Sequence, residues 1–359
     1  MINLTFSTLI MFISTIPEFI ALVMCAINFR KKRYLHYLYM FATWFFLWLG
    51  NLLLAIGYLT LNLVVYKVGL LVTIPLTFFI MLLVDSISRE SIEPFKLSIV
   101  MIVSTLAFAF GLEKNVVALN VSKLGEVGPI VVGRFNYALA ASFLVSSVLW
   151  FYYFLVLYLK SPKNLRKIAS INLLGAIIGG PLAGLVYASG IVWYLPGTDY
   201  FLIAIGALLT TYSFSKEPKL GYILPFKVSR LLLIDIESGL PLFSHTWDNS
   251  GLVDSYLFSG AIHGITNILN ESLHKGLVKE IRLEEASLII KASEEKDYPV
   301  AFVLITNKTS AILSQSLDLL EKNITRTIPK EKIEEITINQ SSNLESYIES
   351  AFPYVVSYT

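Results

Sequence analysis

The chain changes character near residue 216, from an apolar region with few charges to a region of ordinary charged composition. Residues 1–215 hold 14 Lys and Arg and 7 Asp and Glu; residues 216–359 hold the other 14 (28 − 14) and 19 (26 − 7). A helix needs roughly 20 apolar residues to cross a bilayer core of about 30 Å, and several such runs occur upstream. The downstream patterns are typical of a water-soluble fold. We predict a membrane domain over 1–215, a linker over 216–227 and a soluble domain over 228–359.

Apolar runs in the first domain predict an all-α bundle of seven membrane helices. The expected spans are Thr5–Phe29, His36–Leu59, Val68–Ile87, Phe95–Leu112, Arg134–Leu159, Leu165–Ile191 and Trp193–Phe214. The segment between the fourth and fifth spans, 113–133, is too polar to cross a membrane. Its valine-rich ends favour a short hairpin or a cap.

Basic residues gather in the loops on one side of these spans, which indicates the orientation of the chain. One set of loops contains only Lys67, Lys114, Lys123 and Arg134. The opposite set contains twelve: Arg30, Lys31, Lys32, Arg33, Arg89, Lys96, Lys160, Lys163, Arg166, Lys167, Lys216 and Lys219. Since Lys and Arg accumulate in cytoplasmic loops, we predict a cell-membrane protein with its N-terminus outside and its soluble domain in the cytosol.

Glu18 is the exceptional polar residue of the predicted spans, because it lies near the middle of the first, directly after Pro17. An ionisable group at that depth is costly unless it meets a partner or water, so it is a functional candidate by default. Asn51 and Asn172 lie in the middle portions of their spans and are candidate partners. The alternative is a structural role, with a protonated Glu18 hydrogen-bonded to a neighbouring helix.

Glycines and one proline in the sixth predicted span indicate unusual helix packing. The residues are Gly175, Gly179, Gly180, Pro181 and Gly184. Small residues let membrane helices approach closely, and Gly and Pro also accompany kinks. We predict close packing, with a hinge as the alternative.

The soluble domain shows alternating strand-like and helix-like patterns. Two apolar runs flank Glu237-Ser238-Gly239 and predict a hairpin. The expected order is strands 231–236 and 240–245, helix 251–274, strands 279–283, 287–292 and 300–306, and helices 310–323 and 344–352. Strand 300–306 is the most apolar and is expected at the centre. The ββαβββα order predicts a small α/β domain with an antiparallel sheet and packed helices.

This order, over about 228–327, resembles the longin and roadblock superfamily. The matching features are the strand Leu231–Ile236 with its turn, the helix with Ser259-Gly260-Ala261-Ile262, and the strand Ala301–Thr306 followed by a helix. The hairpin-first order is closer to longin domains. The resemblance implies a non-catalytic platform for a cytosolic protein partner, such as a small GTPase, a trafficking protein or another longin or roadblock domain. A homodimer of the chain itself is one of the partnerships that the resemblance implies.

The bundle in turn is similar to the seven-helix sensor region of prokaryotic histidine kinases. The shared features are the basic turn Arg30–Arg33, the Trp48-Leu49-Gly50 stretch and Pro75. The chain departs from that family because no kinase module, ATP-binding box or cyclase signature follows over 216–359. The resemblance therefore implies a membrane sensor with a cytosolic output domain, and no ligand-binding residue is carried over.

Motifs of catalysis are missing from the sequence. Its four histidines have no metal-ligand spacing with Cys, Asp or Glu, and there is no Walker loop, nucleophile elbow or dinucleotide fingerprint. We predict no enzyme activity, cofactor, metal or catalytic residue. The acidic soluble domain argues against nucleic acid. A sensor or receptor in the lipid bilayer is the favoured function, with a transporter or a passive membrane anchor as alternatives.

Overall fold

The computed structural model describes residues 2–89, 91–248, 254–273, 278–293, 299–327 and 341–358. The chain forms two compact units, Met1–Gly221 and Tyr222–Thr359. Their boundary falls inside the segment 216–227 predicted as a linker, where Pro218–Tyr222 forms a short 3₁₀ helix. Each unit is a separate fold.

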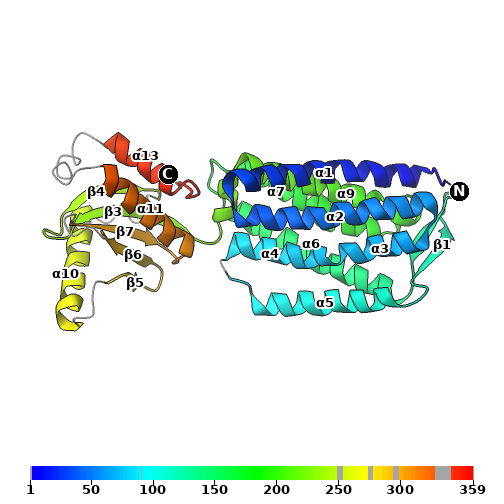
Figure 1. Cartoon of the computed structure of the whole chain (residues 1–359), viewed down its shortest axis with the longest axis horizontal. Helices are drawn as coiled ribbons and strands as arrows, with labels where there is room; N and C mark the ends of the chain where they lie inside the picture. The colour runs from blue at the N-terminus through cyan, green and yellow to red at the C-terminus, as the bar shows by residue number, and fades with distance from the viewer. Residues whose placement is uncertain are drawn as a thin grey trace. The chain divides into compact units, whose positions relative to one another are not determined.

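The first unit is a helical bundle closed by a small hairpin (Figure 1). Its helices are α1 (Phe6–Lys32), α2 (Leu35–Thr60), α3 (Leu63–Thr73), α4 (Pro75–Ser88), α5 (Pro94–Leu112), α6 (Arg134–Lys160), α7 (Arg166–Ile177), a π-helix (Ile178–Leu182), α8 (Ala183–Ala188), a 3₁₀ turn (Ile191–Trp193) and α9 (Thr198–Lys216). α3 and α4 together occupy the third predicted span, and α7 to α8 occupy the sixth.

Six segments among the described residues are long and apolar enough to cross a membrane. They are Phe6–Lys31, Leu35–Thr60, Leu63–Ser88, Pro94–Leu112, Arg134–Lys160 and Arg166–Ala188. These segments agree with a multi-pass membrane protein in contact with a lipid bilayer. The seventh predicted span corresponds to α9, a regular 19-residue helix that is less apolar because it carries Asp199 and several hydroxyl side chains. The count of seven membrane helices stays a prediction.

Two of the membrane segments are interrupted. Pro75 begins α4 and has no amide hydrogen to donate to the preceding turn, so the third segment breaks there. Pro181 lies inside the π-helix of the sixth. Close packing of the sixth segment is confirmed, because a Cβ placed on Gly175 would lie 2.9 Å from the carbonyl oxygen of Gly206 on α9. The π-helix also interrupts this segment, and the hinge that was the alternative stays a prediction.

The segment between α5 and α6 forms the hairpin that the sequence favoured. β1 (Val117–Val121) pairs antiparallel with β2 (Val127–Val131) at the same end of the bundle as the N-terminus (Figure 1). The turn residue Glu126 caps α1: its Oε1 accepts from the Phe6 amide at 3.0 Å and its Oε2 from the Ser7 hydroxyl at 2.5 Å. A carboxylate is favourable at a helix N-terminus because free amides and the helix dipole face it.

The second unit has a five-stranded antiparallel sheet in the order β4-β3-β7-β6-β5. Its elements are β3 (Val228–Asp235), β4 (Pro241–Thr246), α10 (Ser255–Leu273), β5 (Glu280–Arg282), β6 (Ser287–Ala292), β7 (Val300–Thr306), α11 (Ala311–Thr327) and α13 (Ser341–Ala351). The predicted ββαβββα order is confirmed in the described residues, and β7 is central as expected. Parts of the helix predicted over 251–274 (251–253 and 274) lie outside the described residues.

Helices cover both faces of this sheet. Ile262 of α10 packs on one face with Leu232, Leu288 and Val303. α11 lies against β6 and β7 and also packs on α13, which places these two helices on the other face. Phe302 and Leu304, which alternate with Val303, are fully buried. The result is a three-layered α/β unit with β7 at its core.

Candidate functional site

The structure brings two of the three candidate polar residues together. Glu18 lies at the middle of α1 and is 0% exposed, and Asn51 of α2 is 2% exposed. Asn51 Nδ2 donates a hydrogen bond to Glu18 Oε1. The Asn51 amide thus provides a hydrogen-bond donor for one of the two oxygens of the buried Glu18 carboxyl group.

The other polar atoms of this pair lack hydrogen bonds in the described part of the chain. Glu18 Oε2 and Asn51 Oδ1 are both buried and neither has a donor. The half-buried Tyr200 of α9 interacts electrostatically with Glu18. Glu18 is therefore held between α2 and α9, and no basic partner lies beside it in the described part of the bundle.

The third candidate, Asn172, is not joined to the pair by any interaction of the described residues. It lies on α7 and is 0% exposed, and neither atom of its amide has a hydrogen-bond partner there. Asn172 precedes Gly175 by almost one turn, where α7 packs on α9.

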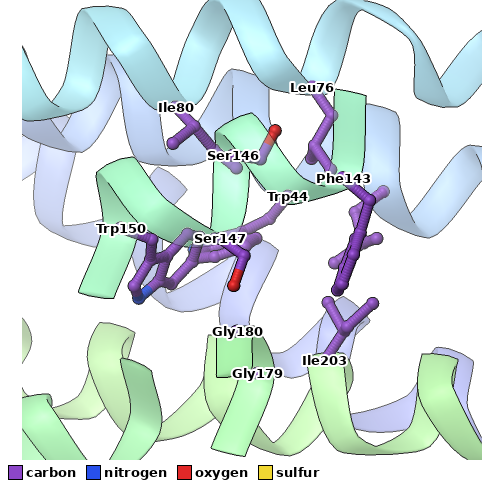
Figure 2. A pocket seen from close by; sticks show the side chains of 11 residues that line it. Trp44, Leu76, Ile80, Phe143, Ser146, Ser147, Trp150, Gly179, Gly180 and Ile203 are labelled. Atoms are coloured by element: carbon purple, nitrogen blue, oxygen red, sulfur yellow. The ribbon is translucent and has the colours of Figure 1, made fainter. Parts of the chain in front are cut away.

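A small cavity lies inside the bundle, about one to two turns along α2 from Asn51 (Figure 2). Its volume is about 30 Å³, which gives room for one or two water molecules. The lining residues come from five segments: Trp44, Leu47, Leu76, Ile80, Phe143, Ser146, Ser147, Trp150, Gly179, Gly180 and Ile203. Sequence reasoning missed this site, and the signal available was the Gly179-Gly180-Pro181 run together with two tryptophans in separate spans.

Both interrupted helices contribute to this cavity. Leu76 directly follows Pro75 at the break between α3 and α4, and Gly179 and Gly180 belong to the π-helix. Ser147 of α6 faces Gly180, as Figure 2 shows, and a Cβ on Gly180 would lie 3.0 Å from its Oγ. Single π turns inside α-helices are frequent at functional sites, so this is the second candidate site of the bundle.

A series of tilted and edge-to-face ring contacts connects the cavity to the end of α9. Successive ring centroids are 4.9 Å apart for Trp44–Trp150, 5.7 Å for Trp150–Phe154, 6.0 Å for Phe154–Phe214 and 5.6 Å for Phe214–His36. We call these five residues the aromatic column. Aromatic pairs at 4.5–7 Å are attractive beyond their burial. At its far end the His36 ring lies against Gly221, the last residue of the first unit.

An ion-pair network lies at the turn between α4 and α5. Lys96 is 9% exposed and Asp85 is 3% exposed, and the Lys96 ammonium donates to Asp85 Oδ1. The same ammonium lies 3.1 Å from Glu93 and 2.8 Å from the Tyr153 hydroxyl, and Asp85 Oδ2 accepts from the Glu93 amide at 2.9 Å. The charges satisfy one another, so this network fastens α4, α5 and α6 together.

No group of three or more His, Cys, Asp or Glu side chains that could hold a metal ion occurs among the described residues. Comparison of the chain with protein-family models, curated proteins and solved structures gives no match.

Proposed function

We propose that the chain is a multi-pass membrane protein of the sensor or receptor class. In this proposal seven helices, including α9, form the sensing bundle, and the second unit is a longin-like output domain in the cytosol. The output domain recruits a signalling, small-GTPase or trafficking partner. The supporting observation is the aromatic column, which leads from the cavity between the broken helices to the residue where the first unit ends.

The second unit supports the proposal through its topology and its surface. Its described elements follow the hairpin-first ββαβββα order on which the longin resemblance rests. Leu257, Ile265 and Ile268 on α10 are 72%, 44% and 64% exposed. Apolar side chains grouped on one exposed surface are typical of protein interaction sites.

The sensor proposal is tested by asking whether a change in the aromatic column alters the second unit. Phe154 and Phe135 are both fully buried aromatic residues of α6, at 1% and 0% exposed, but only Phe154 belongs to the column. We expect Phe154→Leu in the full-length protein in lipid nanodiscs to change amide hydrogen exchange severalfold in parts of 222–359. Phe135→Leu should leave that exchange unchanged. Equal exchange in the parent and both variants would instead favour the passive anchor.

The orientation is tested by labelling single cysteines with a membrane-impermeant reagent. The native Cys25 is 0% exposed and is first replaced by alanine. Leu124, 60% exposed in the hairpin turn, and the exposed Asn164 lie in loops of opposite charge bias. We expect Leu124→Cys to react in intact cells and Asn164→Cys to react only after lysis, because basic residues accumulate on the cytoplasmic side. Reaction of both in intact cells would contradict the proposed topology.

A transporter is the second candidate, favoured by the positions of the two helix breaks. They fall in the third and sixth membrane segments, and residues beside both line one cavity. Interruptions at corresponding positions of two three-helix halves are typical of inverted repeats around a transport site. Cysteine labelling at Ser147, which lines the cavity, distinguishes a transporter from a sensor. Alternating access predicts reaction of Ser147→Cys from both sides of the membrane, whereas a sensor with a closed cavity predicts none.

A further inference from the structure

The Glu18–Asn51 pair has one hydrogen bond and two unused acceptors. Asn51 Nδ2 donates to Glu18 Oε1, which leaves Glu18 Oε2 and Asn51 Oδ1 buried with no donor in the described residues. An ionised carboxylate contains only acceptors, whereas a protonated carboxyl group has one O–H donor. The two unused acceptors belong to the Glu18 carboxyl group and the Asn51 amide, which already share one hydrogen bond. One proton between them would therefore satisfy both.

We propose that Glu18 and Asn51 form a proton-binding site in the middle of the bundle. The bound proton resides on Glu18 Oε2 and is donated to Asn51 Oδ1. With the bond from Asn51 Nδ2 to Glu18 Oε1, this completes a cyclic acid–amide pair with two hydrogen bonds. The pair joins α1 to α2.

The surroundings of the pair favour the neutral acid. α1 packs on α2 and α9, and Tyr200 of α9 interacts electrostatically with Glu18. On α1 itself the nearest titratable side chain is Cys25, two turns away, which is bonded to Thr211 of α9 at 4.0 Å. Within the described residues Glu18 has no basic partner, in contrast to Asp85, which has Lys96. A buried carboxylate without such a partner would be strongly disfavoured.

Proton release has a structural consequence. In the proposed cyclic pair, loss of the Oε2 proton leaves a carboxylate oxygen beside the carbonyl oxygen of Asn51, and two acceptors that share no proton repel each other. Either the Asn51 amide turns away or α1 and α2 separate at this level. Binding of the proton is therefore coupled to the packing of α1 against α2. This coupling does not depend on the proposed signalling by the second unit.

Infrared difference spectroscopy on the full-length protein in lipid tests this site without reference to signalling. We expect the parent-minus-Glu18→Gln spectrum to contain the C=O stretching band of a protonated, hydrogen-bonded carboxyl group. The matched control Glu126→Gln changes a carboxylate that caps α1 and is expected to remove carboxylate bands only. A carboxylate band lost in the Glu18→Gln spectrum would overturn the proposal.

A second variant keeps the test decisive should Glu18→Gln fail to fold. Asn51→Leu removes the amide but keeps Glu18, so the acid C=O band should move to higher frequency as its hydrogen bonds are lost. An acid band that stays unchanged in Asn51→Leu would show that Asn51 is not its partner. Glutamine can form the same two bonds with Asn51, so a folded Glu18→Gln protein is expected to melt within a few degrees of the parent.

Discussion

Replacing Gly206 with alanine is expected to prevent α9 from packing normally against α7. A Cβ at this position would lie 2.6 Å from the carbonyl oxygen of Gly175 and 2.7 Å from the backbone nitrogen of Gly179. Backbone atoms cannot rotate away as a side chain can, so the helices must separate. Overpacking a tight core typically costs about 1–3 kcal/mol and occasionally more, and we place this variant at the upper end. The measurement is the melting temperature and the monodisperse fraction of the purified protein.

Gly184→Ala is the matched control for this prediction. Gly184 lies on α8, where an added Cβ would meet only one atom of the Phe143 ring, at 3.3 Å. Alanine has a higher intrinsic helix propensity than glycine by about 1 kcal/mol, so propensity alone favours both alanine variants. A stable Gly206→Ala protein would mean that α7 and α9 do not approach as closely as the structure places them.

The fold was predictable where one physical quantity determines the outcome. Long apolar runs fixed the six membrane segments, and the apolar strand 300–306 identified the centre of the sheet, because both depend on local composition. The valine-rich ends of the segment between two spans favoured a hairpin or a cap, and the structure has the hairpin. α9 is a regular helix at the expected place, but Asp199 and its hydroxyl residues make it less apolar than the six membrane segments. Composition therefore separates α9 from those six segments.

The site was only partly predictable, because it depends on how helices are rotated against each other. Glu18 was recognisable from the cost of an ionisable group at the middle of a span. Asn51 and Asn172 were equivalent candidates by sequence, and only packing brings Asn51 onto Glu18, whereas Asn172 is buried elsewhere, on α7. The lining of the cavity comes from five segments distant in the sequence. No local sequence pattern predicts that residues so far apart in the chain line one cavity.

The role of Lys96 was also not predictable from the sequence, which indicated only a basic loop residue that helps to set the topology. The structure buries it beside Asp85, and this leads to the second large effect. We expect Lys96→Met to destabilise the protein by about 3–5 kcal/mol, because it leaves the Asp85 carboxylate buried without a cation. The measurement is the melting temperature of the variant in detergent or nanodiscs.

Two further variants separate the buried charge from a general loss of side-chain contacts. Arg89 is half exposed and lies 3.4 Å from Glu93 of the same network, so Arg89→Met should cost no more than about 1 kcal/mol, as surface ion pairs do. Combining Lys96→Met with Asp85→Asn removes both charges of the buried pair, and most of the lost stability should return. If the double variant melts as low as Lys96→Met alone, packing by the lysine side chain, and not the uncompensated carboxylate, holds α4 and α5 together. If Lys96→Met is as mild as Arg89→Met, the Asp85 carboxylate is reached by water and the buried network does not exist in the membrane.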